Sequence, residues 1–240
     1  MISLIPEWLR RCLGIVESPE SLEALVHKKV EAEDFRSVRV TAAFLAKLFQ
    51  YGGVYRRITE AAQLGPQEFG FWLLGDQEVI SDMRLPRQYV RHDYSEVAQH
   101  KRHIVEVREK EGIGLVSWGH YHGSFGPSPS PRDLETLQHV VPSFYEGFSY
   151  RAGHAEIVSY PTIIFNECSE VFAGKQYHWL ERGKTHAGKA LLDLPLVIVP
   201  GRPPRQVSDD EMKSELLEKV HVLHDGGYRL LGRLVEGGAR

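Results

Sequence analysis

The sequence has little of what a disulfide-stapled or strongly charged protein needs. Only two of its 240 residues are cysteines, Cys12 and Cys168, which lie far apart and form no Cys-x-x-Cys pair. This argues against a disulfide framework and a structural zinc knuckle, and predicts a reducing, cytoplasmic location. The formal net charge is only -3, and no long Lys/Arg run is present. The composition therefore predicts neither nucleic acid nor a membrane as the main partner.

Long apolar runs are also missing. The stretch MISLIPEWLRRCLGIV is apolar in patches, but Pro6, Glu7 and two arginines interrupt it, so it predicts neither a secretory signal nor a membrane span. We interpret it as a short packing or partner-binding segment. A hydrophobic content of 42% is enough to bury a full core. The sequence therefore predicts a soluble enzyme with one principal domain and additions at both ends.

What the chain does contain is a pattern of metal-binding residue types in WGHYHGSFGPSPSPRDL. The apolar run before His120 and His122 predicts a strand that carries both at its carboxyl end. Side chains two apart on a strand point to the same face, so both imidazoles can bind one ion while Tyr121 points away. Seven residues then separate His122 from Ser130, and Asp133 follows in the first turn of a predicted helix.

Two imidazoles and a carboxylate are a common zinc shell, and three protein ligands leave the fourth tetrahedral position for water. The Gly and Pro residues of GSFGPSPSP supply the turns that bring Asp133 back toward the strand. An open position is typical of catalysis, because zinc makes water a nucleophile at neutral pH. The pattern thus predicts one Zn²⁺ per chain and a hydrolase.

The same residues have a purely structural interpretation. Ser130 is a good helix N-cap, Pro131 suits the first helical position, and Asp133 is an acidic residue in the first turn. A hydroxyl has one donor and two acceptor lone pairs, so Ser130 can cap the helix and still donate to another group. The two interpretations are compatible.

The spacing His-x-His, seven residues, Ser-x-x-Asp resembles that of the JAMM (MPN+ or JAB domain) zinc metalloproteases, which include deubiquitinase-like isopeptidases. Members of that family carry an upstream Glu leading into a Leu-Leu-Gly-like strand, and GPQEFGFWLLGD offers Glu68 in this context. The resemblance implies that His120, His122 and Asp133 bind zinc. It further implies that Glu68 is the general acid/base and that Ser130 stabilises the oxyanion.

The resemblance covers about Arg36 to Pro200 and has two departures. Family members mostly have a small residue between the histidines and often Pro after them, where this chain has Tyr121 and Gly123. These differences leave the ligand set intact but predict an unusual substrate groove.

Glu68 has two nearby competitors for the acid/base role, Glu60 and Glu78. Alternation along the predicted strand places Gly70 and Trp72 on the face of Glu68. The small Gly70 then predicts room for water and substrate beside the carboxylate.

For the fold, the resemblance implies an α/β (α+β) architecture, the MPN/JAB domain. This is a mixed, curved β-sheet flanked by helices in a cytidine-deaminase-like arrangement, here with helical additions at both ends. We expect an N-terminal helical extension over 1–35, the catalytic domain over 36–200, and a linker and helix over 201–240.

Local patterns predict the elements individually. We expect helices over 18–33, over 40–53 with a break at Gly52 and Gly53, over 58–66, over 95–112, from 133 until Pro142, and over 208–223. The last has a capping box from Ser208 to Glu211. We expect an opening strand at the start of SVRVTAAFLAKLF, further strands over 68–75, 112–122, 156–167, 176–181 and 194–200, and extended chain over 78–90. His221 and His224, near the end of the last helix, are interpreted as favourable charges at the helix terminus rather than metal ligands.

The predicted function is zinc-dependent hydrolysis of the amide bond at the C-terminus of ubiquitin or a ubiquitin-like modifier, in deconjugation or precursor processing. That modifier is the predicted partner, held by segments around Pro86–Ser95 and Phe144–Gly153, and the terminal helices offer a surface for a complex or a homodimer. Three alternatives stay open: hydrolysis of small sulfur-carrier conjugates, a non-catalytic MPN scaffold, and a RadC-like role on nucleic acid. The intact ligand set argues against the scaffold, and the charge balance argues against nucleic acid.

Overall fold

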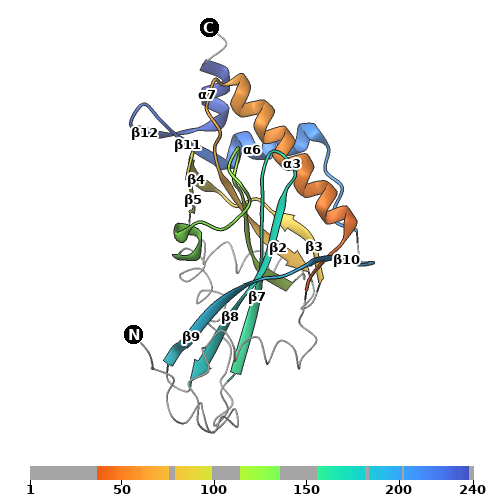
Figure 1. The fold of residues 1–240 in the computed structure, drawn as a ribbon. Helices are drawn as coiled ribbons and strands as arrows, with labels where there is room; N and C mark the ends of the chain where they lie inside the picture. The colour runs from red at the N-terminus through yellow and green to blue at the C-terminus, as the bar shows by residue number, and fades with distance from the viewer. Residues whose placement is uncertain are drawn as a thin grey trace, which may run out of the picture.

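The fold is built on an eight-stranded mixed sheet with the strand order β10-β1-β3-β2-β6-β7-β8-β9 (Figure 1). The computed structural model describes residues 37–75, 79–98, 114–135, 156–181, 184–201 and 203–237. The strands of this sheet are β1 (Val38–Val40), β2 (Phe69–Gly75), β3 (Val79–Arg84), β6 (Gly114–Tyr121), β7 (Glu156–Phe165), β8 (Val171–Glu181), β9 (Lys184–Asp193) and β10 (Leu196–Ile198). Strand β1 pairs in parallel with β3 and β10, and β6 with β7, whereas the other pairs are antiparallel. The predicted mixed α/β fold is confirmed.

The central strand β2, FGFWLLG, is buried along its whole length. It lies between β3 and β6, so neither of its edges faces solvent. A continuous run of bulky apolar residues suits such a strand, because both of its faces are covered. This places the residue just before β2, Glu68, at the edge of the core.

Helix α3 (Ala42–Ala61) packs against the sheet (Figure 1). Thr41 caps its N-terminus by accepting a hydrogen bond from the Phe44 amide at 3.1 Å. The buried positions Phe44, Leu48, Tyr51, Tyr55 and Ile58 recur every three or four residues. One stripe of the helix therefore faces the sheet.

The predicted break at Gly52 and Gly53 is wrong, because α3 continues through both glycines and ends only at Ala61, within the predicted helix over 58–66. A Cβ atom on Gly52 would lie 2.8 Å from the ring of Phe165 on β7. The missing side chain lets the helix approach the sheet closely. Packing thus outweighs the helix propensity of glycine, which is lower than that of alanine by about 1 kcal/mol.

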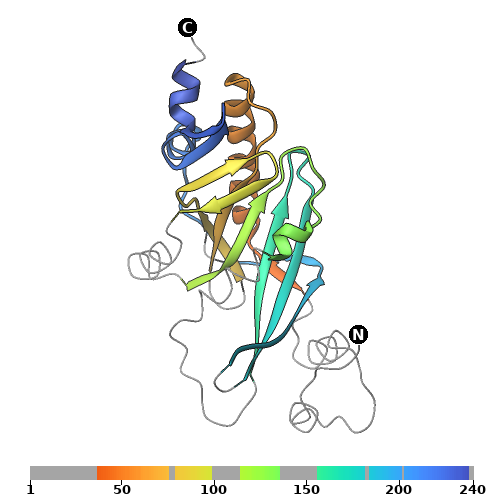
Figure 2. The same ribbon diagram turned by 90° about the vertical axis from the view of Figure 1, so that its left-hand side faces the viewer.

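A second, four-stranded sheet has the order β12-β11-β4-β5. Its strands are β4 (Gln88–Arg91), β5 (Tyr94–Val97), β11 (Val220–His224) and β12 (Gly227–Leu230). Two antiparallel hairpins, β4–β5 and β11–β12, meet through the parallel pair of β4 and β11. Figure 2 shows β4 and β5 in yellow beside the blue hairpin. The predicted helix over 95–112 is wrong at its start, because residues 95–97 belong to β5.

The side chain of Gln88 joins the two sheets. It is fully buried. It accepts a hydrogen bond from the amide of Gly70 at 2.7 Å and donates one to the carbonyl of the same residue at 2.9 Å. One amide side chain thus satisfies the backbone of β2 where the second sheet begins, as buried polar groups require.

The C-terminal elements are α6 (Asp209–Lys219), β11, β12 and α7 (Leu231–Gly237). The predicted capping box between Ser208 and Glu211 is confirmed. The predicted helix over 208–223 is too long, since it ends at Lys219 and Val220 begins β11. Val220 and Val222 lie two positions apart on this strand, and both are buried. β-branched residues such as valine favour strands. The interpretation of His221 and His224 as charges at a helix terminus is therefore wrong.

These C-terminal residues share one hydrophobic core with α3 and the large sheet. Met212 and Leu216 from α6 and Leu231 from α7 belong to the same buried cluster as Phe44 and Phe69. In Figure 1, α7 lies near one end of α3 and α6 beside its middle, while β7, β8 and β9 extend away from these helices.

Several predictions lie outside the described residues. They are the N-terminal segment with Cys12, the helix over 18–33, most of the helix over 95–112, and the segment Phe144–Gly153. Cys168 lies within the described part of the chain, exposed and as a free thiol. No helix in that part is long and apolar enough to cross a bilayer.

Candidate metal centre

Strand β6 delivers His120 and His122 at its carboxyl end, as the sequence predicts. β6 lies between β2 and β7, and its residue His120 is opposite Gly70 on one side and Ile164 on the other. The amide of His122 continues this pairing by donating to the carbonyl of Phe165 at 2.8 Å. Both imidazoles are buried, with 3% and 4% exposure. The sheet therefore fixes the backbone of His120 from two sides and that of His122 from the side of β7.

Tyr121 points to the opposite face, also as predicted. Its ring stacks on Phe69 at a centroid distance of 5.1 Å and packs on Phe165 at 5.0 Å. It also contacts Tyr55 on α3 at 6.1 Å. The large residue between the histidines is thus part of the hydrophobic core rather than of a substrate groove.

A tight loop follows the histidines and orients one of them. Gly123 has a φ of +61°, a conformation that glycine adopts without strain. The Phe125 amide then donates to the carbonyl of His122 at 3.1 Å. The carbonyl of Gly126 lies 2.6 Å from Nδ1 of His122. A proton on Nδ1 leaves the Nε2 lone pair free for a metal, as in most histidine metal sites.

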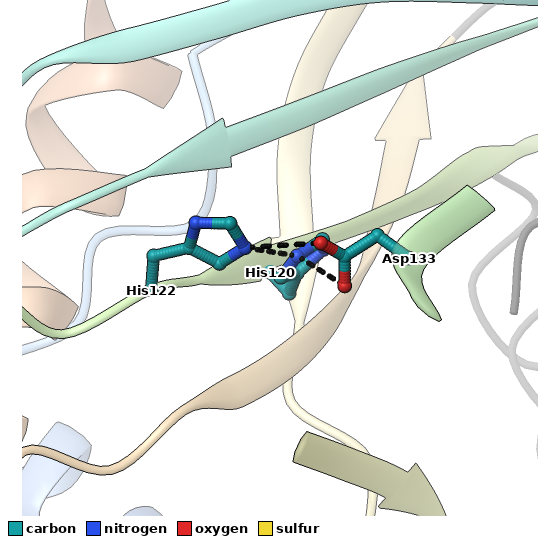
Figure 3. A group of neighbouring side chains, drawn as sticks. All are labelled: His120, His122 and Asp133. Carbon is teal, nitrogen blue, oxygen red and sulfur yellow. Dashed lines mark hydrogen bonds and ion pairs between the residues drawn. The ribbon is translucent and has the colours of Figure 1, made fainter. Parts of the chain in front are cut away.

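Asp133 returns to the histidines from a helical turn over 131–135, as predicted. Figure 3 shows its carboxylate facing both imidazoles from the opposite side. Its Oδ1 lies 3.1 Å from Nε2 of His120, and its Oδ2 lies 3.3 Å from Nε2 of His122. The two Nε2 atoms are 2.8 Å apart. The three ligand atoms thus lie within 4.8 Å of one another.

This donor set fits a zinc ion. Ligand atoms about 2.0–2.1 Å from a tetrahedral zinc lie roughly 3.3–3.4 Å from one another. The two Nε2 atoms, 2.8 Å apart, need to separate by roughly half an ångström. Each carboxylate oxygen of Asp133 already lies within 3.3 Å of one of them, Oδ1 at 3.1 Å from His120 and Oδ2 at 3.3 Å from His122. His120, His122 and Asp133 can therefore hold a divalent metal ion with little rearrangement.

Ser130 holds Asp133 in this orientation. Its backbone N–H donates to Oδ2 of Asp133 at 2.6 Å, and its Oγ accepts from the Asp133 amide at 3.2 Å. The predicted capping role of Ser130 is thus observed. The lone O–H of Ser130 is not used in this pair of bonds, so it keeps a donor for another group.

The protonation states of His120 and Asp133 favour metal binding, whereas that of His122 opposes it. Burial lowers the pKa of His120; its Nδ1 has no hydrogen-bond partner among the residues that the structure describes. Burial alone would raise the pKa of Asp133, but hydrogen bonds from both histidines and Ser130 hold it well below its usual range. Burial also lowers the pKa of His122, but its bonds to Asp133 and Gly126 more than offset this and leave the pKa raised.

Glu68 lines the same pocket as two of these ligands. The pocket is bounded by Glu68, Asp93, Tyr94, Ser95, Trp118, His120, Arg132 and Asp133. Burial raises the pKa of Glu68 to about 8, against the effect of the nearby His122, which lowers it. Its competitor Glu60 is exposed on α3 beside Arg56, and Glu78 lies outside the described residues.

The open space predicted beside Gly70 is filled by an indole ring. A Cβ atom on Gly70 would lie 1.9 Å from the ring of Trp118. That ring packs edge-on against Trp72 at a centroid distance of 5.0 Å. The glycine therefore makes room for Trp118, which itself lines the pocket, and not directly for substrate.

Five lining residues, Asp93, Tyr94, Ser95, Trp118 and Arg132, were not predicted individually as site residues, although the first three belong to the segment Pro86–Ser95 that the resemblance placed beside the substrate. Trp118 lies two positions before His120, so strand alternation places it on the same face, and this signal could have found it. Arg132 adjoins Asp133, but one cation in a polar loop is not diagnostic. Asp93 and Tyr94 reach the pocket from the second sheet, and no local pattern predicts that placement.

Comparisons with known proteins add little to this geometry. No model of a known protein family matches the sequence, and a search of curated proteins found no match. Among solved structures, a JAB1/MPN domain protein from Archaeoglobus fulgidus aligns with 67% of this chain and 98% of its own, at 16% identity and a TM-score of 0.23. Values this low establish no common function. The site is therefore assessed from its own residues.

Proposed function

We propose that the protein is a zinc-dependent isopeptidase of the JAMM type. It hydrolyses the amide bond at the C-terminus of ubiquitin or a ubiquitin-like modifier, in the cytoplasm and with one zinc ion per chain. The observation that carries the proposal is the meeting of His120, His122 and Asp133 in one pocket with a buried carboxyl group, Glu68. Three ligands and an unligated acid are the parts that metal-assisted hydrolysis requires.

His120, His122 and Asp133 would hold the ion, and Glu68 and Ser130 would handle protons and charge. A bound zinc supplies Lewis-acid chemistry, since it makes water a nucleophile at neutral pH and polarises a carbonyl oxygen. Glu68 accepts the proton of the attacking water and delivers it to the leaving amine. The pKa of Glu68, about 8 in the metal-free chain, lies close to neutral pH. A cation bound nearby would lower this pKa, so that Glu68 can both accept and release a proton.

Ser130 supports the reaction in two ways. Its backbone amide and Oγ orient Asp133, and its free O–H is a donor for the negative charge that develops on the scissile carbonyl oxygen. Trp118 and Tyr94 form apolar walls of the pocket. Such walls exclude water and strengthen the electrostatic interactions inside.

The first experiment combines metal analysis with cleavage. Purified protein would be analysed for zinc and incubated with ubiquitin and ubiquitin-like proteins fused to a reporter through their C-termini, including a small sulfur-carrier protein. We expect about one zinc per chain and cleavage at the fusion junction. Glu68→Gln should keep the metal and lose cleavage, whereas His122→Ala should lose both. Glu60→Gln, which removes an exposed carboxylate from α3, is the matched control and should behave as the wild type.

Two results would overturn the proposal. A wild type that binds no divalent metal would leave only a non-catalytic scaffold role. Full activity of Glu68→Gln would remove the proposed acid/base. Cleavage of the sulfur-carrier fusion alone would keep the chemistry but change the substrate class.

A further inference from the structure

The outer face of the four-stranded sheet carries a row of aromatic side chains. Tyr94 on β5, Tyr89 on β4, His221 on β11 and Tyr228 on β12 are the members, and we call this row the aromatic face. The ring of Tyr89 lies 5.0 Å from that of His221 and 5.1 Å from that of Tyr228, measured between centroids. One member thus comes from each of the four strands.

Strand alternation separates this face from the core. Val90, Val220 and Val222 point inward and are completely buried. Tyr89, His221 and Tyr228 point to the opposite side and keep part of their surface in solvent. Tyr228 is 43% exposed. A sheet that buries one face and exposes rings on the other is unusual for a surface without a partner, because clustered exposed apolar area marks interaction sites.

The aromatic face begins at the catalytic pocket. Tyr94 lines that pocket together with Glu68 and His120. The guanidinium of Arg132, the neighbour of Asp133, lies 4.3 Å from the centroid of the Tyr94 ring, and that of Arg91 lies 5.4 Å from it. These cation–π contacts stiffen the end of the face where a scissile bond would enter.

The other end of the aromatic face is a hollow of about 570 Å³ between the β11–β12 hairpin and α7. It is lined by His221, Tyr228, Arg229, Leu230, Arg233 and Leu234. Arg233 is exposed and forms no ion pair among the described residues, whereas Arg229 approaches Asp225 only at 3.9 Å. The hollow therefore combines an apolar floor with cations available to a partner.

We propose that the aromatic face docks the folded body of the protein substrate, and that the docked surface of this modifier is apolar and acidic. This inference rests on the function proposed above. Tyr and Arg are among the residue types that dominate binding energy in protein interfaces. Three tyrosines belong to this face, and arginines lie at its two ends, Arg132 beside Tyr94 and Arg229 and Arg233 in the hollow. The face is continuous with the catalytic pocket, so a body docked there presents its C-terminal tail to Glu68.

Charge decides the class of partner. Arg132, Arg229 and Arg233 favour an acidic surface. Carboxylates are interspersed with these cations, since Asp93 pairs with Arg91 at 2.8 Å and Asp225 lies beside Arg229. A phosphate backbone would be repelled by these carboxylates, and its binding depends on neutralising many charges at once. A protein with mixed apolar and acidic residues fits the face better than nucleic acid does.

The test compares a protein substrate with a short one. Ubiquitin carrying a C-terminal rhodamine amide and a peptide of its last five residues with the same rhodamine amide would be used as probes. In Tyr228→Ala and Arg233→Glu we expect the KM for the ubiquitin probe to rise tenfold or more, with kcat unchanged. The kcat/KM for the peptide should stay within twofold of the wild type, because the peptide does not reach the face. Arg56→Glu on α3, an exposed arginine remote from the face, is the control.

The outcomes separate this inference from the proposed function. Equal losses on both probes, or no loss on the ubiquitin probe, would overturn the docking role. Loss of binding to a fluorescent single-stranded RNA with unchanged hydrolysis would assign the face to nucleic acid instead. If the wild type cleaves neither probe, the isopeptidase function is what fails. Titration of ¹⁵N-labelled ubiquitin then tests the face directly, and identical shifts with wild type and Arg233→Glu would rule docking out. Melting temperatures confirm that both variants fold.

Discussion

The two sheets of this molecule place polar groups in opposite ways. In the large sheet, His120 lies in β6 and His122 directly follows this strand. Both histidines are almost fully buried and are held by short hydrogen bonds. The small sheet carries Tyr89, His221 and Tyr228 on a partly exposed face. Its members contact one another mainly through ring packing.

This difference shows which of the two sites needs precisely placed atoms. A metal centre requires donors fixed within a few tenths of an ångström, and only a buried backbone network supplies that. A docking face tolerates side-chain adjustment, so partial burial is sufficient. Substitutions in the large sheet should therefore abolish chemistry, and those in the small sheet should weaken recognition or stability by modest amounts.

The largest effect is expected from the ligands. Asp133→Asn should remove metal binding and reduce cleavage to an undetectable level, because Asp133 contacts both histidines. Zinc analysis after dialysis against a chelator and readdition of zinc measures this directly. Wild type should recover both metal and activity on readdition, and recovery by Asp133→Asn would contradict its role as a ligand.

Glu68→Gln should lower kcat by about 10²–10⁴-fold, the usual contribution of a general acid/base, while the zinc content stays at the wild-type level. The variant leaves a side chain of nearly the same size in the pocket. Single-turnover cleavage beside metal analysis separates the two effects, with Glu60→Gln as the control.

The same substitution predicts a change in stability with pH. The pKa of Glu68 is about 8 in the folded, metal-free chain and near 4.3 in the unfolded chain. The folded state therefore holds a proton that the unfolded state loses, so stability of the metal-free wild type should fall as pH rises from about 5 to 8 and level off above. At about 1.4 kcal/mol per pKa unit, the loss is a few kcal/mol. Urea unfolding at several pH values should show that Glu68→Gln lacks this component, and parallel curves for both proteins would contradict it.

Asn166 offers an intermediate effect. It is buried in the turn after β7, donates from Nδ2 to the carbonyl of Phe125 at 3.1 Å and to Glu170 at 2.7 Å, and accepts from the Cys168 amide. The loop that it holds carries Gly126, the partner of His122. Asn166→Ala should weaken zinc affinity about 10–100-fold, as loss of an outer-shell partner does.

The matched control for Asn166 is Cys168→Ser, which alters an exposed side chain of the same turn and should leave zinc affinity unchanged. Competition with a chromophoric chelator measures the affinity, and the melting temperature of the metal-free protein measures stability. A fall in melting temperature without a change in zinc affinity would assign Asn166 a merely structural role.

The smallest effects concern neighbouring residues on β11. Val222→Ala removes buried methyl groups and should lower the free energy of unfolding by about 1–3 kcal/mol. Leu223→Ala changes a side chain that is 39% exposed and should stay within about 0.5 kcal/mol of the wild type. Urea unfolding compares the two, and equal effects would contradict the inward and outward alternation of this strand.

The sequence predicted the local parts of this structure well. Strand β6, the two histidines at its end and the helical turn with Asp133 all follow from short spacings. The break at Gly52 and Gly53 was wrong because a local rule on glycine cannot include the ring of Phe165, more than a hundred residues later. The end of α6 was misplaced for the same reason, since Val220 becomes a strand only because β4 lies beside it.

The candidate site divides in the same way. Its ligands lie within fourteen residues of one another and have a diagnostic pattern. The pocket wall made by Asp93 and Tyr94 depends on how the second sheet meets the first, through contacts such as the one between Gln88 and Gly70. No local sequence pattern predicts how the two sheets pack against each other.

The parallel pairing of β4 with β11 has a consequence for synthesis on the ribosome. Chains emerge from the N-terminus, and domains fold as their segments become available. β4 and β5 emerge before the strand that carries the histidines, but their partner β11 emerges only after the large sheet is complete. The hairpin β4–β5 must therefore wait without its neighbour, and pairing between segments so distant in sequence forms slowly. The newborn chain thus acquires the scaffold of the candidate metal site before the surface that we propose as the docking face.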